Sequence, residues 1–488
     1  MTDLNEAELA REFARRGLTR RQVMTIGARL GLSSATLAAV LALHQRETAA
    51  SSTAGATAKR AQNQGSIFDK NAGADGPWPQ TAVPEPTEKI TLSVSHAWDA
   101  TFMERQNQFD ELFTQRHPNI GIAAENTSPF SDYLPKYTTQ AAGGKLPDIM
   151  YTQFSWAQQF IQNDLFIAVD DYIAKQPDFN LPDFTPQSLV SYKYQDKLWG
   201  VPYDEGPANL YYNRDLFDKA GIGYPDETWT LDSLKDAALK LTSGEGGDKI
   251  YGLGELPTPG DALMAPPYLF PFGAQYVSEP KEDECLIGKP EAVQAMQWWE
   301  ELRDKGAVPN PDEMASVAWP PFQFGKIAMT QQGSWATPPI RAGSKFNWDI
   351  AMWPAGPQKH STFSAGSCYA ITRDAKNQDA AWIYLNDYLS TAGQVYMWAL
   401  TGRGSPARLS AWPAYLESEF APPGAKYVQQ AMAQGIASHD IIDQPTGPQV
   451  TQTAGPIWDE VIAGNMSVED ALNEVCAEIS PLLAKNKS

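Results

Sequence analysis

Aromatic side chains stand directly beside carboxylate or amide groups at three places in this chain. These places are Trp98–Asp99, Gln153–Phe154 with Trp156, and Tyr203–Asp204–Glu205. A sugar needs this combination, because polar side chains hydrogen-bond its hydroxyls while aromatic rings stack on the C–H faces of its ring. The alternative for each aromatic residue is an ordinary place in the core. For the two carboxylates after Tyr203, the alternative is a structural hydrogen bond.

The spacing of the cysteine and histidine residues does not predict a metal site or a set of disulfides. The three cysteines, Cys285, Cys368 and Cys476, form no CxxC pair, so at most one bridge can form. The five histidines show no ligand spacing, and no HExxH occurs. We therefore expect no metal site, no cofactor and no reliance of the fold on disulfides.

Charge and length limit the classes of protein. The chain has 488 residues, 42% of them hydrophobic, which is enough for two or three domain-sized units. Its formal net charge is -20, so neither a nucleic acid nor an anionic membrane surface would attract the molecule as a whole.

The first 58 residues resemble a twin-arginine export signal. Thr19-Arg20-Arg21 precedes two apolar residues, and an apolar run follows from Leu30 to Leu43, too short to span a membrane comfortably. Ala56-Thr57-Ala58 is a candidate cleavage site, and residues 59–87 read as a flexible linker. No cysteine stands directly after the apolar run, where a lipid anchor would be attached. We therefore expect a soluble periplasmic product without a lipid anchor, exported by the Tat translocase. The alternative is an amphipathic cytosolic helix.

The chain then alternates between strand and helix patterns. Strands are predicted at residues 89–95, from residue 120 and near residues 146–151. Between them, one helix pattern includes Phe102 and ends near His117-Pro118, and a second helix is predicted over 133–142. Further amphipathic helices are predicted at 231–241, capped by Thr230, and at 294–302 and 380–389. This alternation predicts an α/β fold with parallel strands, whose ligands collect at the carboxyl ends of the strands.

Several ordered motifs resemble the bacterial family 1 extracellular solute-binding proteins of ABC importers. The motifs extend from about residue 88 to about residue 410, and no single one is decisive. They are KYTTQAAGGKLPDIMYTQ ending at Gln153, WGVPY ending at Tyr203, LYYNRDLF ending at Phe217, FGKIAMT ending at Thr330, Gly333-Ser334-Trp335 and FSAGSCYAIT ending at Thr372.

The resemblance implies a two-lobe periplasmic-binding-protein-like fold with a hinge and a central ligand cleft. Lobe one would comprise residues 88–203 and 358–405, and lobe two residues 204–357 and 406–488. The chain would cross between the lobes near Tyr203, Gln358 and Ser405. A sugar or related polar solute would bind in the cleft, and the receptor, a monomer, would deliver it to a membrane permease.

The resemblance also extends the candidate site. It places a lobe-two tryptophan at Trp335 and ligand contacts after the first strand, at Trp98 and Asp99. Gly366, Ser367 and Arg403 would line the two return crossings.

An exported glycoside hydrolase is the alternative from a different class. Tryptophan-rich loops, many carboxylates and the export signal would suit it, and such an enzyme needs two carboxylates across one glycosidic bond. The run 257–272 could be a ligand-shaping insertion or a surface loop. No catalytic motif occurs, so we expect a binding protein and not an enzyme.

Overall fold

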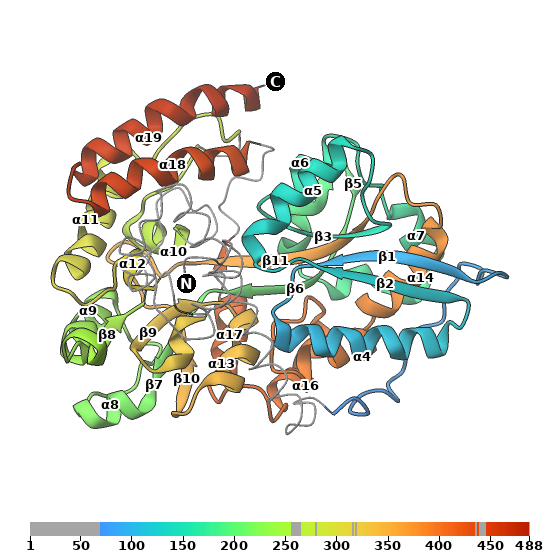
Figure 1. Ribbon diagram of the computed structural model, residues 1–488, viewed down its shortest axis with the longest axis horizontal. Coiled ribbons are helices and arrows are strands. Elements are labelled where there is room, and N and C mark those ends of the chain that lie inside the picture. The colour runs from blue at the N-terminus through green and yellow to red at the C-terminus, as the bar shows by residue number, and fades with distance from the viewer. Residues whose placement is uncertain are drawn as a thin grey trace, which may run out of the picture. The chain divides into compact units, whose positions relative to one another are not determined.

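The structure is a computed structural model that describes residues 69–254, 265–278, 281–314, 317, 320–434, 437–438 and 446–487 (Figure 1). The predicted export signal lies outside the described residues, as does the first half of the run 257–272, residues 257–264. The description below concerns the compact unit that begins at Lys70.

The first sheet has six strands, in the order β12-β11-β3-β1-β2, with β6 also paired to β11. β1 pairs in parallel with both β2 and β3, whereas β11 runs antiparallel to β3 and to β6. The predicted parallel α/β layer is therefore confirmed. The strands are β1 (Ile90–His96), β2 (Ile120–Asn126), β3 (Ile149–Gln153), β6 (Val201–Pro207), β11 (Thr362–Ile371) and β12 (Ala437–Ser438).

The second sheet has four strands in the order β10-β7-β9-β8. β7 is central, with antiparallel partners on both sides, and β8 joins in parallel. A small hairpin of β4 (Lys193–Tyr194) and β5 (Lys197–Leu198) stands apart. The four strands of the second sheet are β7 (Asn209–Asn213), β8 (Tyr251–Leu253), β9 (Ile327–Gln332) and β10 (Trp348–Ala351).

Helices cover the sheets, and α4 and α5 lie on opposite faces of the first one (Figure 1). Asp99 caps α4 by accepting from the backbone N–H groups of Thr101 and Phe102, and Thr230 caps α9 as predicted. The α-helices are α4 (Ala100–Arg116), α5 (Tyr133–Ala142), α6 (Ala157–Ile161), α7 (Asp170–Lys175), α8 (Arg214–Ala220), α9 (Leu231–Leu241), α10 (Pro266–Leu269), α11 (Pro290–Asp304), α12 (Pro311–Met314), α13 (Thr337–Gly343), α14 (Gln378–Leu389), α15 (Thr391–Gln394), α16 (Trp412–Leu416), α17 (Ala425–Ala433), α18 (Gly447–Ile462) and α19 (Val468–Leu483).

Each sheet has a hydrophobic core of its own. Tyr203 at the end of the WGVPY motif belongs to the first core, and Leu210 on β7 already belongs to the second. The chain passes back from the second core to the first between Trp353, which belongs to the second core, and Cys368, which belongs to the first. This change of core is compatible with crossings near Tyr203 and Gln358, and the lobe boundaries themselves stay a prediction.

The prediction of a flexible linker is wrong for its second part. Val83 is 7% exposed in the first core, and the half-buried Trp78 packs there too, with the Arg116 guanidinium 4.9 Å from its ring centroid. Backbone groups of this segment bond distant side chains: Ala82 N donates to Gln176 Oε1 at 2.8 Å. Residues 70–87 therefore form a strap bound to the first sheet and its helices.

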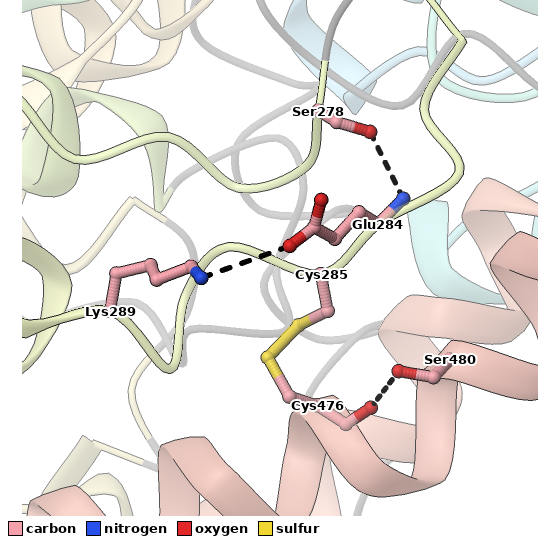
Figure 2. The surroundings of a disulfide bond; sticks show 6 residues. All are labelled: Ser278, Glu284, Cys285, Lys289, Cys476 and Ser480. Atoms are coloured by element: carbon pink, nitrogen blue, oxygen red, sulfur yellow. Dashed lines mark hydrogen bonds and ion pairs between the residues drawn. A yellow bond between two sulfur atoms is a disulfide. The ribbon is translucent and has the colours of Figure 1, made fainter.

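One disulfide joins Cys285 to Cys476, with a Cα–Cα distance of 5.4 Å (Figure 2). It fastens α19 to the segment that precedes α11. Beside it, Glu284 forms an ion pair with Lys289 at 3.8 Å, while Cys368 is free and buried. The sequence allowed one bridge among the three cysteines but did not show which two would pair. The expectation that the fold does not rely on disulfides did not anticipate this bond.

Candidate functional site

The predicted site residues gather where β3, β11 and β6 lie side by side. Ser367 on β11 stands opposite Gln153 on one side and Asp204 on the other, and Gly366 stands opposite Glu205. Five of the twelve predicted residues thus occupy two neighbouring rungs of one sheet, although up to 214 positions separate them in the chain. The sheet register, not local sequence, brings them together.

Asp204 is held by a backbone hydrogen bond from the neighbouring strand. Its Oδ1 accepts a hydrogen bond from the Ser367 backbone N–H at 2.7 Å. The side chain is half-buried in its surroundings, and the loss of solvation raises the pKa of Asp204 to about 7, although the nearby Arg403 charge opposes this shift. Asp204 therefore changes its protonation near neutral pH.

Glu205 points into the protein and makes hydrogen bonds there. It is 1% exposed, and its Oε1 accepts from the Ser364 hydroxyl. Its backbone N–H donates to Ser405 O at 3.0 Å, so β6 is held against the loop that follows Arg403. The structural hydrogen bond considered as the alternative for this carboxylate is present.

Arg403 connects residues from both sheets. Its Nη1 lies 3.2 Å from Asp99 Oδ2, at the end of β1, and 3.2 Å from the backbone oxygen of Trp335, after β9. Its guanidinium also lies 4.3 Å from the ring centroid of Phe102. The arginine is 8% exposed, so this ion pair is shielded from water.

The loop around Arg403 has an unusual backbone. Gly402, Gly404 and Ser405 adopt φ angles of 66°, 68° and 52°, a left-handed region that serine rarely visits. A Cβ on Gly206 of β6 would stand 2.3 Å from the Ser405 hydroxyl oxygen, so a glycine is needed there. The close approach of Ser405 to Gly206, together with the hydrogen bond from Glu205 N to Ser405 O, holds this loop against β6.

Trp98 and Tyr203 lie deeper than expected for ligand contacts. They are 3% and 0% exposed, and their ring centroids are 5.8 Å apart. The Trp98 indole N–H donates to Gln106 Oε1 at 3.2 Å, and Tyr203 stacks on Trp398 at 4.8 Å. In this conformation both rings support the site from behind, which matches the core alternative.

Trp335 and Phe154 meet between the two sheets. Trp335 is half-buried in the 3-10 turn η8 (Ser334–Ala336), and it packs against a small cluster of Phe154, Ala208 and Ala365. A Cβ on Gly333 would lie 2.0 Å from the Trp335 ring, so glycine at this position lets the indole fold back over the chain. This contact joins the end of β9 to the end of β3.

The end of β3 is fixed by hydrogen bonds to β11. Phe154 N donates to Gly366 O at 3.2 Å, and Tyr192 OH donates to the same oxygen at 2.8 Å. Gln153 Nε2 donates to Ser155 Oγ at 2.7 Å. Gly366 has little room for a side chain, because a Cβ would stand 2.8 Å from Asp204 O.

Trp156 belongs to an aromatic stack. Its neighbours are Phe130 at a centroid distance of 5.6 Å, and Tyr133 and Tyr151 at 6.3 Å each. Tyr151 OH lies 3.3 Å from Ser367 Oγ, which ties the stack to the strand pair. Phe130 and Tyr151 were not among the predicted site residues. The position of Phe130 shortly after the predicted second strand is a signal that could have identified it.

No group of three or more His, Cys, Asp or Glu residues that could hold a metal ion occurs in the described part of the chain. Nor does any helix of those residues have the length and apolar character to cross a membrane. The arrangement offers hydrogen-bonding groups and aromatic faces on two sheets, which suits binding of a polar solute.

Known proteins share this arrangement of elements. The family model described as bacterial extracellular solute-binding protein matches residues 108–420. The sn-glycerol-3-phosphate-binding periplasmic protein of Escherichia coli K12 is 31% identical over 276 residues, which cover 54% of this chain and 61% of that protein. The lactose-binding protein of Rhizobium radiobacter is 22% identical over 327 residues, 64% of this chain and 74% of that one.

A solved structure extends the likeness to the fold. An ABC substrate-binding protein of Listeria monocytogenes, in complex with cycloalternan, superposes with a TM-score of 0.73 at 22% identity, covering 81% of this chain and 99% of that one. Two α/β lobes are the fold of such proteins, so the predicted fold class is confirmed. On the family match, which covers most of its length, the chain belongs to the bacterial extracellular solute-binding proteins.

Proposed function

We propose that this protein captures a sugar or related polar solute between its two sheets and delivers it to the permease of an ABC importer. The observation that carries this proposal is Arg403, whose guanidinium contacts Asp99 from the first sheet and Trp335 from the second. A ligand that bonds these groups would touch both lobes at once. It would then favour the closed arrangement, because it binds that arrangement better.

The names of the relatives and neighbours include both sugars and a phosphate ester. One relative is named for lactose and one neighbour holds cycloalternan, whereas another relative is named for glycerol phosphate. An anion would need a cationic group, and the Arg403 guanidinium is already paired with Asp99. The net charge of -20 also disfavours an anionic ligand. We therefore place a neutral sugar or polyol in the site.

The proposal also covers the export route, the cellular location and the oligomeric state of the protein. Export by the Tat translocase, a periplasmic location and a monomeric state follow from the predicted signal and from the resemblance. The disulfide between Cys285 and Cys476 supports an oxidising compartment, since such bonds persist mainly outside the cytosol.

A thermal-shift screen over mono- and oligosaccharides, polyols and glycerol phosphate tests the proposal. We expect one class of neutral sugar or polyol to raise Tm, with the solute recovered chemically intact. A shift produced by glycerol phosphate alone would contradict the choice of a neutral ligand. Hydrolysis products would favour the glycoside hydrolase, for which Asp99 and Asp204 would be the carboxylates to replace first.

A further inference from the structure

The strap at residues 70–87 is fastened to the helices of the first sheet by a buried histidine. His117 caps the carboxyl end of α4 and is 6% exposed. Its Nδ1 lies 2.5 Å from Glu85 Oε1 in the strap, and its Nε2 lies 3.1 Å from Asp387 Oδ2 in α14. The imidazole ring thus stands between two carboxylates from distant parts of the chain.

The two contacts of the ring require it to be protonated. A neutral imidazole carries one N–H, so it donates to one carboxylate only, and its other nitrogen turns a lone pair toward the second one. The imidazolium ion donates to both. Burial by itself would lower the pKa of His117, but the hydrogen bonds and charges of Asp387 and Glu85 outweigh burial and raise this pKa. The ring is therefore a cationic link between the strap and α14.

The charges around the ring balance only in this protonated form. Arg116 Nη1 donates to the same Asp387 oxygen that the ring contacts. On the side of α4 the ring packs against the uncharged Phe113, with the two ring centroids 4.6 Å apart. Among the described residues, two cations, Arg116 and protonated His117, thus meet two carboxylates. Loss of the proton leaves one of these carboxylates without a cationic partner.

The exposure of the two carboxylates decides which contact is lost on deprotonation. The Asp387 side chain is 2% exposed, whereas that of Glu85 is 45% exposed. A buried carboxylate loses more than an exposed one when a hydrogen bond is removed, because water cannot replace the donor. The ring therefore keeps its Nε2–H toward Asp387 and releases the Nδ1 proton to solvent. Glu85 then faces a lone pair and turns toward water.

We propose that His117 and Glu85 form a pH-sensitive latch, which holds the end of the strap while the ring is protonated and releases it as the pH rises. The latched state binds the proton more tightly than the released state, since Glu85 faces the ring only in the former. The contribution of the latch is fully present below the pKa of the released state and is lost as the pH rises through the raised pKa of the latched state. Because histidine ordinarily titrates near pH 6.5, this loss occurs above about pH 6.5.

The segment that the latch controls leads directly into β1. Before the latch, Ala82 N donates to Gln176 Oε1 at 2.8 Å. After it, Ile90 N donates to Asn119 O at 2.9 Å. Backbone amides of this kind exchange slowly with solvent only while their segment stays in place. Hydrogen exchange at residues 81–90 therefore reports whether the latch is closed.

Hydrogen exchange measured by mass spectrometry between pH 5.5 and 8.5 tests the latch on the full chain. The exchange rate at each pH is divided by that of an unstructured peptide of the same sequence, which removes the intrinsic pH dependence of exchange. We expect the protection of residues 81–90 in the wild type to fall roughly tenfold across this range, because release of one proton is linked to opening of the latch.

Glu85→Gln is the decisive variant. Its amide accepts from a protonated Nδ1 and donates to a neutral one, so the contact no longer depends on the charge of the ring. The side chain at this position is 45% exposed, so the substitution leaves the fold intact. We expect the fall in protection with pH to disappear. Glu88→Gln removes the same charge from an exposed residue of the same segment and is the matched control, which should keep the wild-type fall.

Three results would overturn the latch. The first is a protection of residues 81–90 that does not change with pH in the wild type. The second is an equal fall in wild type and Glu85→Gln, which would assign the pH dependence to another group, such as Asp110, whose pKa burial raises to about 7. The third is loss of the fall in Glu88→Gln as well, which would make it an effect of net charge. None of these results depends on a ligand, so the proposed function is tested separately.

Discussion

Trp335 is the single side chain on which ligand binding should depend most. Its indole is half-buried against Phe154, and its backbone oxygen, which a substitution leaves in place, accepts from Arg403. We expect Trp335→Ala to fold and to lose at least tenfold in affinity, about 1.4 kcal/mol, because a sugar ring loses its stacking partner. Calorimetry with the solute found by thermal shift measures this.

Trp348 provides the control for that substitution. It is also a half-buried tryptophan of the second sheet, but its ring stacks on Tyr211 at 5.9 Å and takes no part in the site. Trp348→Ala should lower stability and leave affinity unchanged. Equal losses of affinity in the two variants would place Trp335 outside the ligand contacts.

Asp204 should make stability depend on pH. Its pKa is raised to about 7 by burial, so the folded state keeps a proton that the unfolded state releases near pH 4. Its contribution is fully present below about pH 4 and is lost as pH rises toward about 7. We therefore expect the stability difference between Asp204→Asn and wild type to shift in favour of the variant between pH 4.5 and 7.5.

Urea unfolding at several pH values measures this difference. Asp110 is the matched control, because burial raises its pKa to about 7 as well, in the first core beside Tyr384. Asp110→Asn should show the same trend without any effect on ligand binding. A pH-independent difference for Asp204→Asn would mean that this carboxyl ionises normally in the folded protein.

The sequence was sufficient to predict several residues of the candidate site, but not the side chains that each of them contacts. Asp99 and Arg403 were both predicted for the site, but their ion pair joins positions 304 residues apart and depends on the completed fold. Trp98 beside Asp99 looked like a ligand contact, whereas its ring packs in the first core, where the indole N–H donates to Gln106 of α4. A sequence shows that an aromatic residue follows a strand, but not which way its ring points.

Among the elements, α19 is joined to the rest of the protein by a covalent bond that can be removed by mutation. The disulfide ties Cys476 on this helix to Cys285, and it closes a loop of 191 residues. Replacing both cysteines by serine should lower the free energy of unfolding by about 2–4 kcal/mol, because the unfolded chain regains conformational freedom. Chemical unfolding with and without reductant measures the effect.

The free cysteine gives the control for that experiment. Cys368→Ser keeps the disulfide, so its stability should respond to reductant as wild type does. The double variant should not respond at all. A reductant effect that persists in the double variant would show that the stabilisation comes from elsewhere.

Elements with a strong local signal were predicted well. The helix at Leu231–Leu241 was recognised from its apolar face and its cap, and the Thr230 side chain accepts from Ser233 N as expected. The strap at residues 70–87 was not recognised, because its Ala, Gly and Pro content is typical of a linker. Its hold on the sheet comes from distant partners such as Gln176, which accepts from Ala82 N.

For the whole molecule, the two α/β layers have separate hydrophobic cores. The contacts of Arg403 with Asp99 and Trp335 join residues that follow strands of the two sheets at the site. A ligand that replaces or extends these contacts can hold the layers together. The order of the motifs predicted this architecture, whereas the ligand itself depends on the exact positions of a few side chains.

Calorimetric titration of the protein with the sugar or polyol found by thermal shift tests the central claim most directly. We predict saturable binding of one ligand per chain, a negative heat-capacity change from the buried aromatic surface, and recovery of the solute intact. Absence of binding heat with every neutral sugar and polyol, or recovery of hydrolysed products, would contradict the account.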